Sequence, residues 1–300
     1  MTQRILLVLL ALMMMAPAQA QHRKKSASEP SMSGLYVFVD GGLLIPNKKQ
    51  AAFYDGRNSR PNTIDRVLRS EQYGTAIWNS LVDQQLISPS AIPDYRAFTV
   101  AEYPSMYYKL TYQLGLGFRY MYKSGFGWLL RFDYSQVAAT GQFLLSINNG
   151  TGILGGNQYV ACGIYGMEKR MLIDFAITKR WNLSATMDLE MDVGFDVNNT
   201  KVGSHNMRIG GHDYSILDVW GGQSPYTGIG TYEYINQGTM GIGGFATLAL
   251  SYRYHGSAID FGYTCYNMQT KYIDFNEADA YAFQHNIFVR FNINNFSFFK

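Results

Sequence analysis

The segment "NLSATMDLEMDVGFDV" (residues 182–197) alternates strictly between two kinds of side chain. Every second residue from Leu183 to Val197 is apolar or small. The acids between them are Asp188, Glu190, Asp192 and Asp196. Successive side chains of a β-strand point to opposite faces, so this period of two predicts a strand with one apolar and one acidic face. The fold depends on what covers each face.

Composition restricts the class of protein. The chain has 300 residues, of which 47% are hydrophobic and 15% aromatic, so it can bury a core and is not a disordered chain. Charged residues make up only 16%, against about 25% in an average soluble domain. The 23 Tyr and 30 Gly favour β-structure. A net charge of +3 gives no indication of a nucleic-acid partner.

The first residues read as a targeting segment. Arg4 precedes the apolar run "ILLVLLALMMM" (5–15), and Ala18-Gln19-Ala20 is a small-residue cleavage site. The run is too short to cross a membrane as a helix. We therefore expect residues 1–20 to be a cleaved signal peptide and residues 21–33 to be a flexible periplasmic stub.

The rest of the chain predicts eight strands. Their approximate ranges are 35–45, 106–122, 126–148, 167–179, 183–197, 239–254, 258–272 and 282–298. Three connections are tight, at 123–125, 180–182 and 256–257, and suit short hairpins. The other four are long, at about 46–105, 149–166, 198–238 and 273–281. Long and short connections alternate along the chain, which is typical of an up-and-down barrel with all tight turns at one end.

Strand length also favours a membrane protein, because most of these segments reach the 9–11 residues that a transmembrane strand needs. We predict an all-β fold for residues 34–300, a transmembrane antiparallel barrel with long external loops and short periplasmic turns. Lipid then covers the apolar face, and the acidic face lines the lumen. A soluble β-sandwich also alternates, and the pattern alone leaves it open.

The inward phase of the strands predicts a charge network in the lumen. Its members are Arg119, Arg131, Asp133, Arg170, Asp174, Asp188, Glu190, Asp192, Arg253, Asp260 and Arg290. The tight turns predict that Gly117 lies opposite Arg131 and Gly115 opposite Asp133. They also predict the pairs Arg170–Asp192, Asp174–Asp188 and Arg253–Asp260. Such a network either plugs a narrow barrel or forms a proton or ion path, and the mixed signs favour the plug.

Aromatic residues gather beside the predicted tight turns, as expected for a belt at the membrane–water interface. They are Tyr120, Tyr122, Trp128, Trp181, Tyr252 and Tyr254. The last segment carries Phe296, Phe298 and Phe299, which resembles the aromatic-ended strand by which outer-membrane barrels are recognised, although Lys300 follows it.

The sequence offers little for catalysis or metal binding. His255 and Ser257 resemble the His-x-Ser pair of lipid A deacylases, but they fall in a predicted periplasmic turn and no acid follows at the matching distance. His205, His212 and Asp213 do not have the spacing of a compact metal site. Cys162 and Cys265 are far apart in sequence, and we expect two unpaired thiols. The sequence predicts no catalytic site, metal or cofactor.

The first long loop is the most distinctive connection. Residues 63–87 place Ile64, Val67, Leu68, Ile77, Trp78, Leu81 and Val82 at helical spacing. This predicts an amphipathic helix that packs either on a partner or on the protein itself as a lid.

As a whole, the chain resembles the small outer-membrane β-barrel proteins of Gram-negative bacteria, of the OmpA-type class and in particular the eight-stranded barrels of Bacteroidota grouped with secretion accessory proteins such as PorT. The resemblance rests on architecture and composition over residues 34–299. It implies an integral outer-membrane barrel in contact with lipid, with a structural or interaction role in which external loops bind a protein or surface polymer. The alternatives are a lipid-modifying enzyme and a narrow, porin-like channel.

Overall fold

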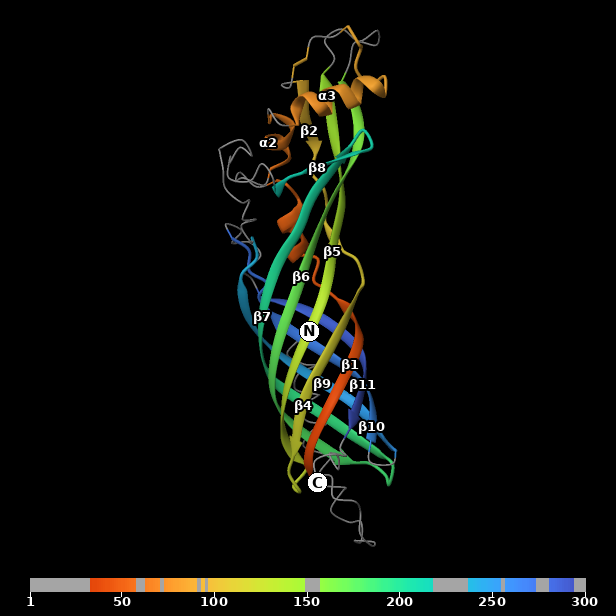
Figure 1. Ribbon diagram of the computed structural model, residues 1–300, viewed down its shortest axis with the longest axis vertical. Coiled ribbons are helices and arrows are strands. Elements are labelled where there is room, and N and C mark those ends of the chain that lie inside the picture. Colours follow the sequence, from red (N-terminus) through yellow and green to blue (C-terminus); the bar gives the residue numbers. More distant parts are fainter. Residues whose placement is uncertain are drawn as a thin grey trace, which may run out of the picture. The chain divides into compact units, whose positions relative to one another are not determined.

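The computed structural model (Figure 1) describes residues 33–57, 63–70, 73–90, 93–94, 97–148, 157–217, 237–254, 257–273 and 281–293. The predicted signal peptide, residues 21–32 of the stub and the C-terminal phenylalanines lie outside the described residues. In the part of the chain that the structure describes, no helix is both long and apolar enough to cross a membrane.

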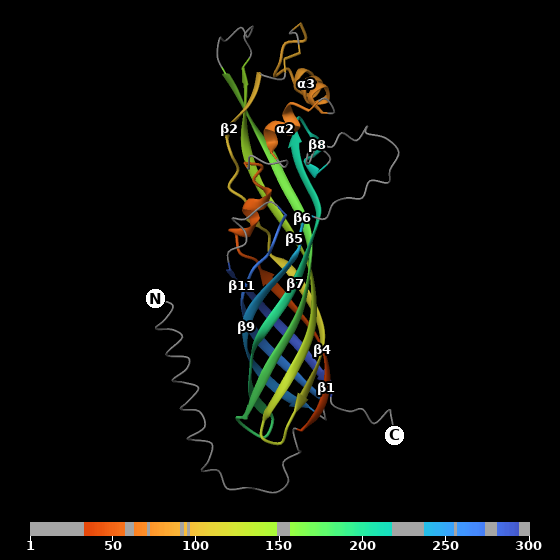
Figure 2. The same cartoon turned by 90° about the vertical axis from the view of Figure 1, so that its left-hand side faces the viewer.

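Long strands form a closed antiparallel barrel (Figures 1 and 2). They are β1 (Gly34–Ile45), β4 (Thr111–Met121), β5 (Phe126–Asn148), β6 (Asn157–Asn182), β7 (Met187–Ile209), β9 (Met240–Tyr254), β10 (Ser257–Met268) and β11 (Ala282–Ile293). Each strand pairs with the next in the order β5–β4–β1–β11–β10–β9–β7–β6, and β6 pairs with β5 to close the ring. The predicted eight-stranded up-and-down barrel is confirmed. Tight turns join β4 to β5, β6 to β7 and β9 to β10 at one end, which we call the tight-turn end.

The alternation of the opening segment appears as two opposite faces. Asp188, Glu190 and Asp192 are buried in the lumen, whereas Val193 and Phe195 are exposed on the outside. The same phase holds on the other strands: the apolar residues predicted to point outward are exposed or half-buried. The face assignment from the period of two is therefore confirmed.

Two predicted registers are wrong, although the faces are right. Asp174 lies opposite Asp196 and Arg170 opposite Thr200, because the β6–β7 turn is at 183–186 and not at 180–182. The Ser184 hydroxyl oxygen accepts from the backbone N–H groups of Thr186 and Met187, which fixes the turn there. A shift by an even number of residues keeps every side chain on its face.

The third hairpin shows a smaller shift. Tyr254 pairs with Ser257, so Ser257 is the first residue of β10 and not part of a turn at 256–257. Arg253 therefore lies opposite Ala258, and Asp260 opposite Ser251. By contrast, the first hairpin is as predicted, with Gly117 opposite Arg131 and Gly115 opposite Asp133.

The strands β5, β6 and β7 continue far beyond the barrel (Figures 1 and 2). The ladder between β7 and β9 ends at Asn199 and Met240, while β6 and β7 stay paired up to Gly163 and Arg208. Residues 157–166 and 198–209, predicted as loop, are therefore strand. Two short edge strands complete this sheet, β2 (Phe98–Glu102) beside β5 and β8 (His212–Ser215) beside β7.

Two helices cover one face of the extended sheet, α2 (Ile64–Leu68) and α3 (Gly74–Asp83). The Thr63 side chain caps α2 by accepting a hydrogen bond from the Arg66 N–H. We call β2, β8, α2, α3 and the extended parts of β5–β7 the head. Among the described residues, its buried hydrophobic core includes Ile77 and Leu81 of α3 and Ile164 of β6. The predicted helical segment thus packs within the chain, as a lid does, and is split into two helices.

Candidate functional site: a charged lumen, a sealed mouth and an apolar outer face

The lumen is filled by buried arginines and carboxylates. Arg131 on β5 is 1% exposed. Its Nε and Nη2 atoms donate to Asp174 Oδ2 at 2.9 and 2.5 Å, and its Nη2 donates to the Tyr266 hydroxyl at 2.6 Å. Asp133 lies 3.0 Å and Asp40 3.7 Å from the same guanidinium. A buried cation is tolerated only when it is paired in this way.

Two more arginines share a second group of acids. Arg119 pairs with Glu190, and its Nη2 lies 3.3 Å from Asp192. Arg290 lies 3.6 Å from Asp192 and 3.8 Å from Asp260. The ion pairs thus connect β4, β7, β10 and β11 across the lumen.

The tight-turn end of the lumen holds two further pairs. Arg180 pairs with Glu190, and Arg253 Nε lies 3.2 Å from Asp188 Oδ2. The predicted Arg253–Asp260 pair is wrong because the register of the β9–β10 hairpin is shifted. Asp188, which was predicted to lie opposite Asp174, pairs with Arg253. All eleven residues predicted for the network point inward, with Arg253 half-buried.

Several members of the network are not among the residues predicted for it. Asp40 bridges Arg131 and Arg290. The Tyr266 hydroxyl accepts a hydrogen bond from Arg131 and donates one to Asp133. Asp196, in the opening segment, is also buried in the lumen. Asp40 follows the inward phase set by Tyr36 and Phe38, so the period of two could have found it.

Glycines on β4 make room for these side chains. A Cβ atom at Gly115 would collide with the carboxylates of Asp40 and Asp133, and one at Gly117 would collide with the Phe38 ring. Because Gly115 lies opposite Asp133, the space it leaves is filled by the network itself.

Acids outnumber arginines in the lumen. The carboxylates are Asp40, Asp133, Glu168, Asp174, Asp188, Glu190, Asp192, Asp196 and Asp260, and the guanidiniums are Arg119, Arg131, Arg170, Arg180, Arg253 and Arg290. No group of three or more potential metal ligands occurs within the described residues. The lumen is thus a packed ionic core with acidic excess.

The mouth opposite the tight-turn end is closed by a cluster around Glu168 of β6. Its carboxylate accepts hydrogen bonds from the hydroxyls of Tyr54 and Tyr272 at 2.7 Å each, and from Tyr108 at 3.3 Å. Arg170 Nε donates to it at 2.6 Å. Since Glu168 is fully buried, these donors replace water around the charge.

The three tyrosines come from separate segments. Tyr54 ends a 3-10 helix, η1 (Gln50–Tyr54), Tyr108 lies on β3 (Tyr107–Tyr108), and Tyr272 follows β10. Within η1, Gln50 lies across the opening: its Nε2 donates to the Met268 carbonyl at 3.5 Å and its Oε1 accepts from Gln284 at 3.0 Å. The first long connection therefore enters the mouth and seals it.

His205 stands where the mouth meets the head. Its ring is fully buried, and its Nε2 lies 3.1 Å from the Tyr54 carbonyl oxygen. Burial lowers the pKa of His205 to about 4, so the ring is neutral at physiological pH. His212 and Asp213 lie at the exposed edge strand β8, where Asp213 pairs with Arg208 at 2.6 Å.

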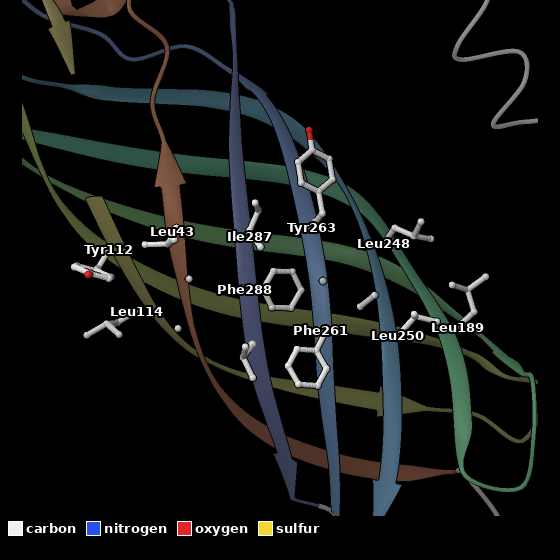
Figure 3. A pocket seen from close by; sticks show the side chains of 15 residues that line it. Leu43, Tyr112, Leu114, Leu189, Leu248, Leu250, Phe261, Tyr263, Ile287 and Phe288 are labelled. Carbon is white, nitrogen blue, oxygen red and sulfur yellow. The ribbon is translucent and has the colours of Figure 1, made fainter. Parts of the chain in front are cut away.

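The outer face of the barrel is apolar. A groove of about 950 Å³ crosses β4, β1, β11, β10, β9 and β7. Leu43, Phe261, Tyr263 and Ile287 lie around it (Figure 3). Exposed apolar side chains continue on the other strands, such as Ile177, which is 68% exposed. A surface of this kind is stable against lipid and not against water. The fold is that of a transmembrane β-barrel, as the sequence predicted.

The predicted aromatic belt lies at the tight-turn end. Tyr120 packs against Tyr122 with ring centroids 5.1 Å apart and stacks on Trp128 at 6.2 Å. Tyr252 and Tyr254 are exposed at the end of β9, and Trp181 is half-buried near the end of β6. Their position in the membrane interface stays a prediction.

The position of Ser257 does not support the resemblance of His255 and Ser257 to the His-x-Ser pair of lipid A deacylases. Ser257 is the first residue of β10 and is exposed at the tight-turn end, while His255 lies outside the described residues. Both cysteines are free thiols, as expected.

No family model matches this sequence, and no curated protein matches it. Solved structures with a similar fold include Neisserial surface protein A (TM-score 0.37, 9% identity, 88% of this chain and 98% of that chain). Two others are Ail of Yersinia pestis in complex with the heparin analogue sucrose octasulfate (0.34, 10%, 87% and 99%) and the outer membrane protein OprG from Pseudomonas aeruginosa (0.35, 11%, 88% and 97%).

Proposed function

We infer that this protein is an outer-membrane anchor which carries a folded head at the cell surface, and that the head binds a protein or a surface polymer. The observation that carries this function is the head itself. Three barrel strands continue out of the membrane region and gain a separate hydrophobic core there. A loop that only closed the barrel needs no such core, whereas a binding surface needs a rigid support.

The direction of the head follows from the turns. Outer-membrane barrels have short turns on the periplasmic side and long excursions outside. The head lies opposite the tight turns, so it faces the exterior when the chain is exported through the signal peptide at residues 1–20. A secretion accessory or a surface-polymer receptor is consistent with that placement.

The outward face of the head sheet is the surface that we assign to binding. Tyr159 on β6 is 59% exposed, and Tyr165 on the same strand packs against the Arg208 guanidinium at 5.8 Å. Arg208 is held by Asp213 of β8. Tyrosine and arginine are enriched where proteins bind one another, because they combine large contact area with hydrogen bonding.

Photo-crosslinking in living cells tests this assignment. A photoreactive amino acid at Tyr159 should capture a defined set of surface or secretion proteins, or polymer. The matched control is the same amino acid at Tyr122, an exposed tyrosine at the tight-turn end, which should capture a different set. Capture of nothing at Tyr159, or of the same set at both positions, would contradict the proposed function.

The channel alternative has little support from the geometry. The arginine–carboxylate network fills the lumen, and the Glu168 cluster closes the mouth. We expect the purified protein to give no conductance in planar bilayers. Glu168→Gln removes the charge that holds the three tyrosines. If stable single-channel conductance appeared in the unmodified protein, the proposed function would be wrong about the sealed lumen.

A further inference from the structure

The lysines of this protein have an unusual distribution. Among the described residues they are Lys48, Lys49, Lys109, Lys123, Lys169, Lys179, Lys201 and Lys271. Lys123 and Lys179 lie at the tight-turn end, and the other six lie at the head end of the barrel. We call these six the lysine belt. None of them points into the lumen, which holds arginines instead.

The strand ends place the lysine belt at one level of the barrel. Lys48 and Lys49 follow the end of β1, and Lys109 precedes the start of β4. Lys271 follows β10, and its carbonyl accepts from the Thr239 N–H just before β9. The belt therefore surrounds the barrel where the lipid-facing strands end.

The centre of the belt is a pair of like charges. Lys169 on β6 lies directly opposite Lys201 on β7, two residues beyond the last β7–β9 pair. Both side chains are exposed, and neither has an ion-pair partner among the described residues. Like charges directly opposite one another destabilise a sheet. Such a pair is explained when an anion lies between or beside the two ammonium groups.

The neighbouring residues indicate where that anion comes from. Met171, two residues along β6, is 59% exposed, and Met240 at the start of β9 is 63% exposed, so apolar lipid-facing surface begins directly beside the lysines. Every Asp and Glu of the eight barrel strands points into the lumen, so these strands supply no counter-charge on the outside. A lipid headgroup is the anion that the adjoining apolar surface would bring to this height.

We propose that the lysine belt, with Lys169 and Lys201 at its centre, binds the phosphate groups of an anionic lipid in the external leaflet. Lysine is a strong binder of phosphate as a point charge, and its long stem can lie along apolar surface while the ammonium reaches the headgroup. The proposal rests on the outward direction of the head that the proposed function assigns. It does not depend on whether the head has a partner.

The test measures lipid binding to the mature protein in detergent micelles by native mass spectrometry. The probes are diphosphorylated lipid A and the same lipid A with its phosphates removed. The variant Lys169→Gln/Lys201→Gln should bind the phosphorylated form about 30-fold more weakly, which is ~2 kcal/mol at ~1 kcal/mol per lysine. The variant Lys123→Gln/Lys179→Gln, at the other end, should bind as the unmodified protein does.

A second variant separates binding from folding. Lys201→Glu places an opposite charge beside Lys169, so it should fold at least as stably while it loses the phosphorylated lipid. Equal binding by all variants, or equal loss in the control pair, would overturn the proposal. Displacement of the lipid by millimolar inorganic phosphate would also overturn it, since that result assigns the site to a free ion. All of these readouts are independent of crosslinking from the head.

Discussion

The barrel and the head are built on the same three strands but have opposite interiors. In the barrel, the inward residues of β5, β6 and β7 include Arg131, Asp174 and Asp192, whereas in the head they include Phe143, Ile164 and Met207. The difference lies in what surrounds each part. Lipid takes the apolar side of the barrel, so the inside is polar, while water surrounds the head, so its inside is apolar.

Stability therefore comes from different sources along one strand. The lumen depends on the pairing of its arginines with carboxylates, because an unpaired buried charge costs several kcal/mol. The head depends on close packing of aliphatic side chains. Substitutions should therefore act differently in the two parts.

Arg131→Met should have the largest effect. It leaves Asp174 and Asp133 without the guanidinium they share, while Asp40 keeps Arg290. We expect a loss of about 3–5 kcal/mol in the free energy of unfolding. Urea unfolding in micelles, followed by the gel mobility shift of the folded barrel, measures it. Adding Asp174→Asn should recover part of the loss. If Arg131→Met alone cost less than 1 kcal/mol, the lumen would not depend on its ion pairs.

His205 should make the stability of the head depend on pH. Its pKa is about 4 in the folded protein and about 6.5 when exposed. The unfolded head binds more protons, so the stabilisation is fully present above about pH 6.5 and is lost as the pH falls to about 4, by about 3 kcal/mol in all. Protease cleavage within residues 63–90 should rise over this range. His205→Gln should flatten the dependence; a profile unchanged by the substitution would assign it to another group.

Ile77→Val should have the smallest effect, about 1 kcal/mol, because it removes one methylene from the closely packed core of the head. Hydrogen exchange should increase in head peptides and stay the same in β1, β10 and β11. Leu250→Ala, on the lipid-facing side, serves as the control for a lost apolar side chain outside that core. Faster exchange throughout the barrel after Ile77→Val would show that the two parts unfold as one unit.

Much of the barrel could be predicted from the sequence, because the period of two assigns each side chain to a face without knowledge of the turns. The registers between the strands were harder to predict from the sequence. Both 180–182 and 183–186 can form a short turn, and the Ser184 hydrogen bonds that decide between them depend on the folded backbone. The predicted registers are wrong by an even number of residues, so the set of inward-pointing residues is correct but their cross-strand partners are not. Arg253, for example, pairs with Asp188.

Only part of the head could be predicted from the sequence. Its helical segment has a clear period, but "NQYVACGIYG" (157–166) and "NNTKVGSHNMRI" (198–209) lack the strong contrast between acids and apolar residues. Their alternation is weaker because both faces there carry small and polar residues. The Glu168 cluster could not be predicted at all, since Tyr54, Tyr108 and Tyr272 meet only through the tertiary fold.

The ladder between β1 and β11 has a consequence for biogenesis. It joins the first strand to the last, with Val37 opposite Ile293, whereas every other barrel ladder joins consecutive hairpin partners or strands nearer in sequence. A nascent chain that stops before residue 282 would leave the backbone edges of β1 and β10 unpaired, which hydrocarbon does not tolerate. Closure of the barrel therefore requires the last strand, β11, to be present and paired with β1.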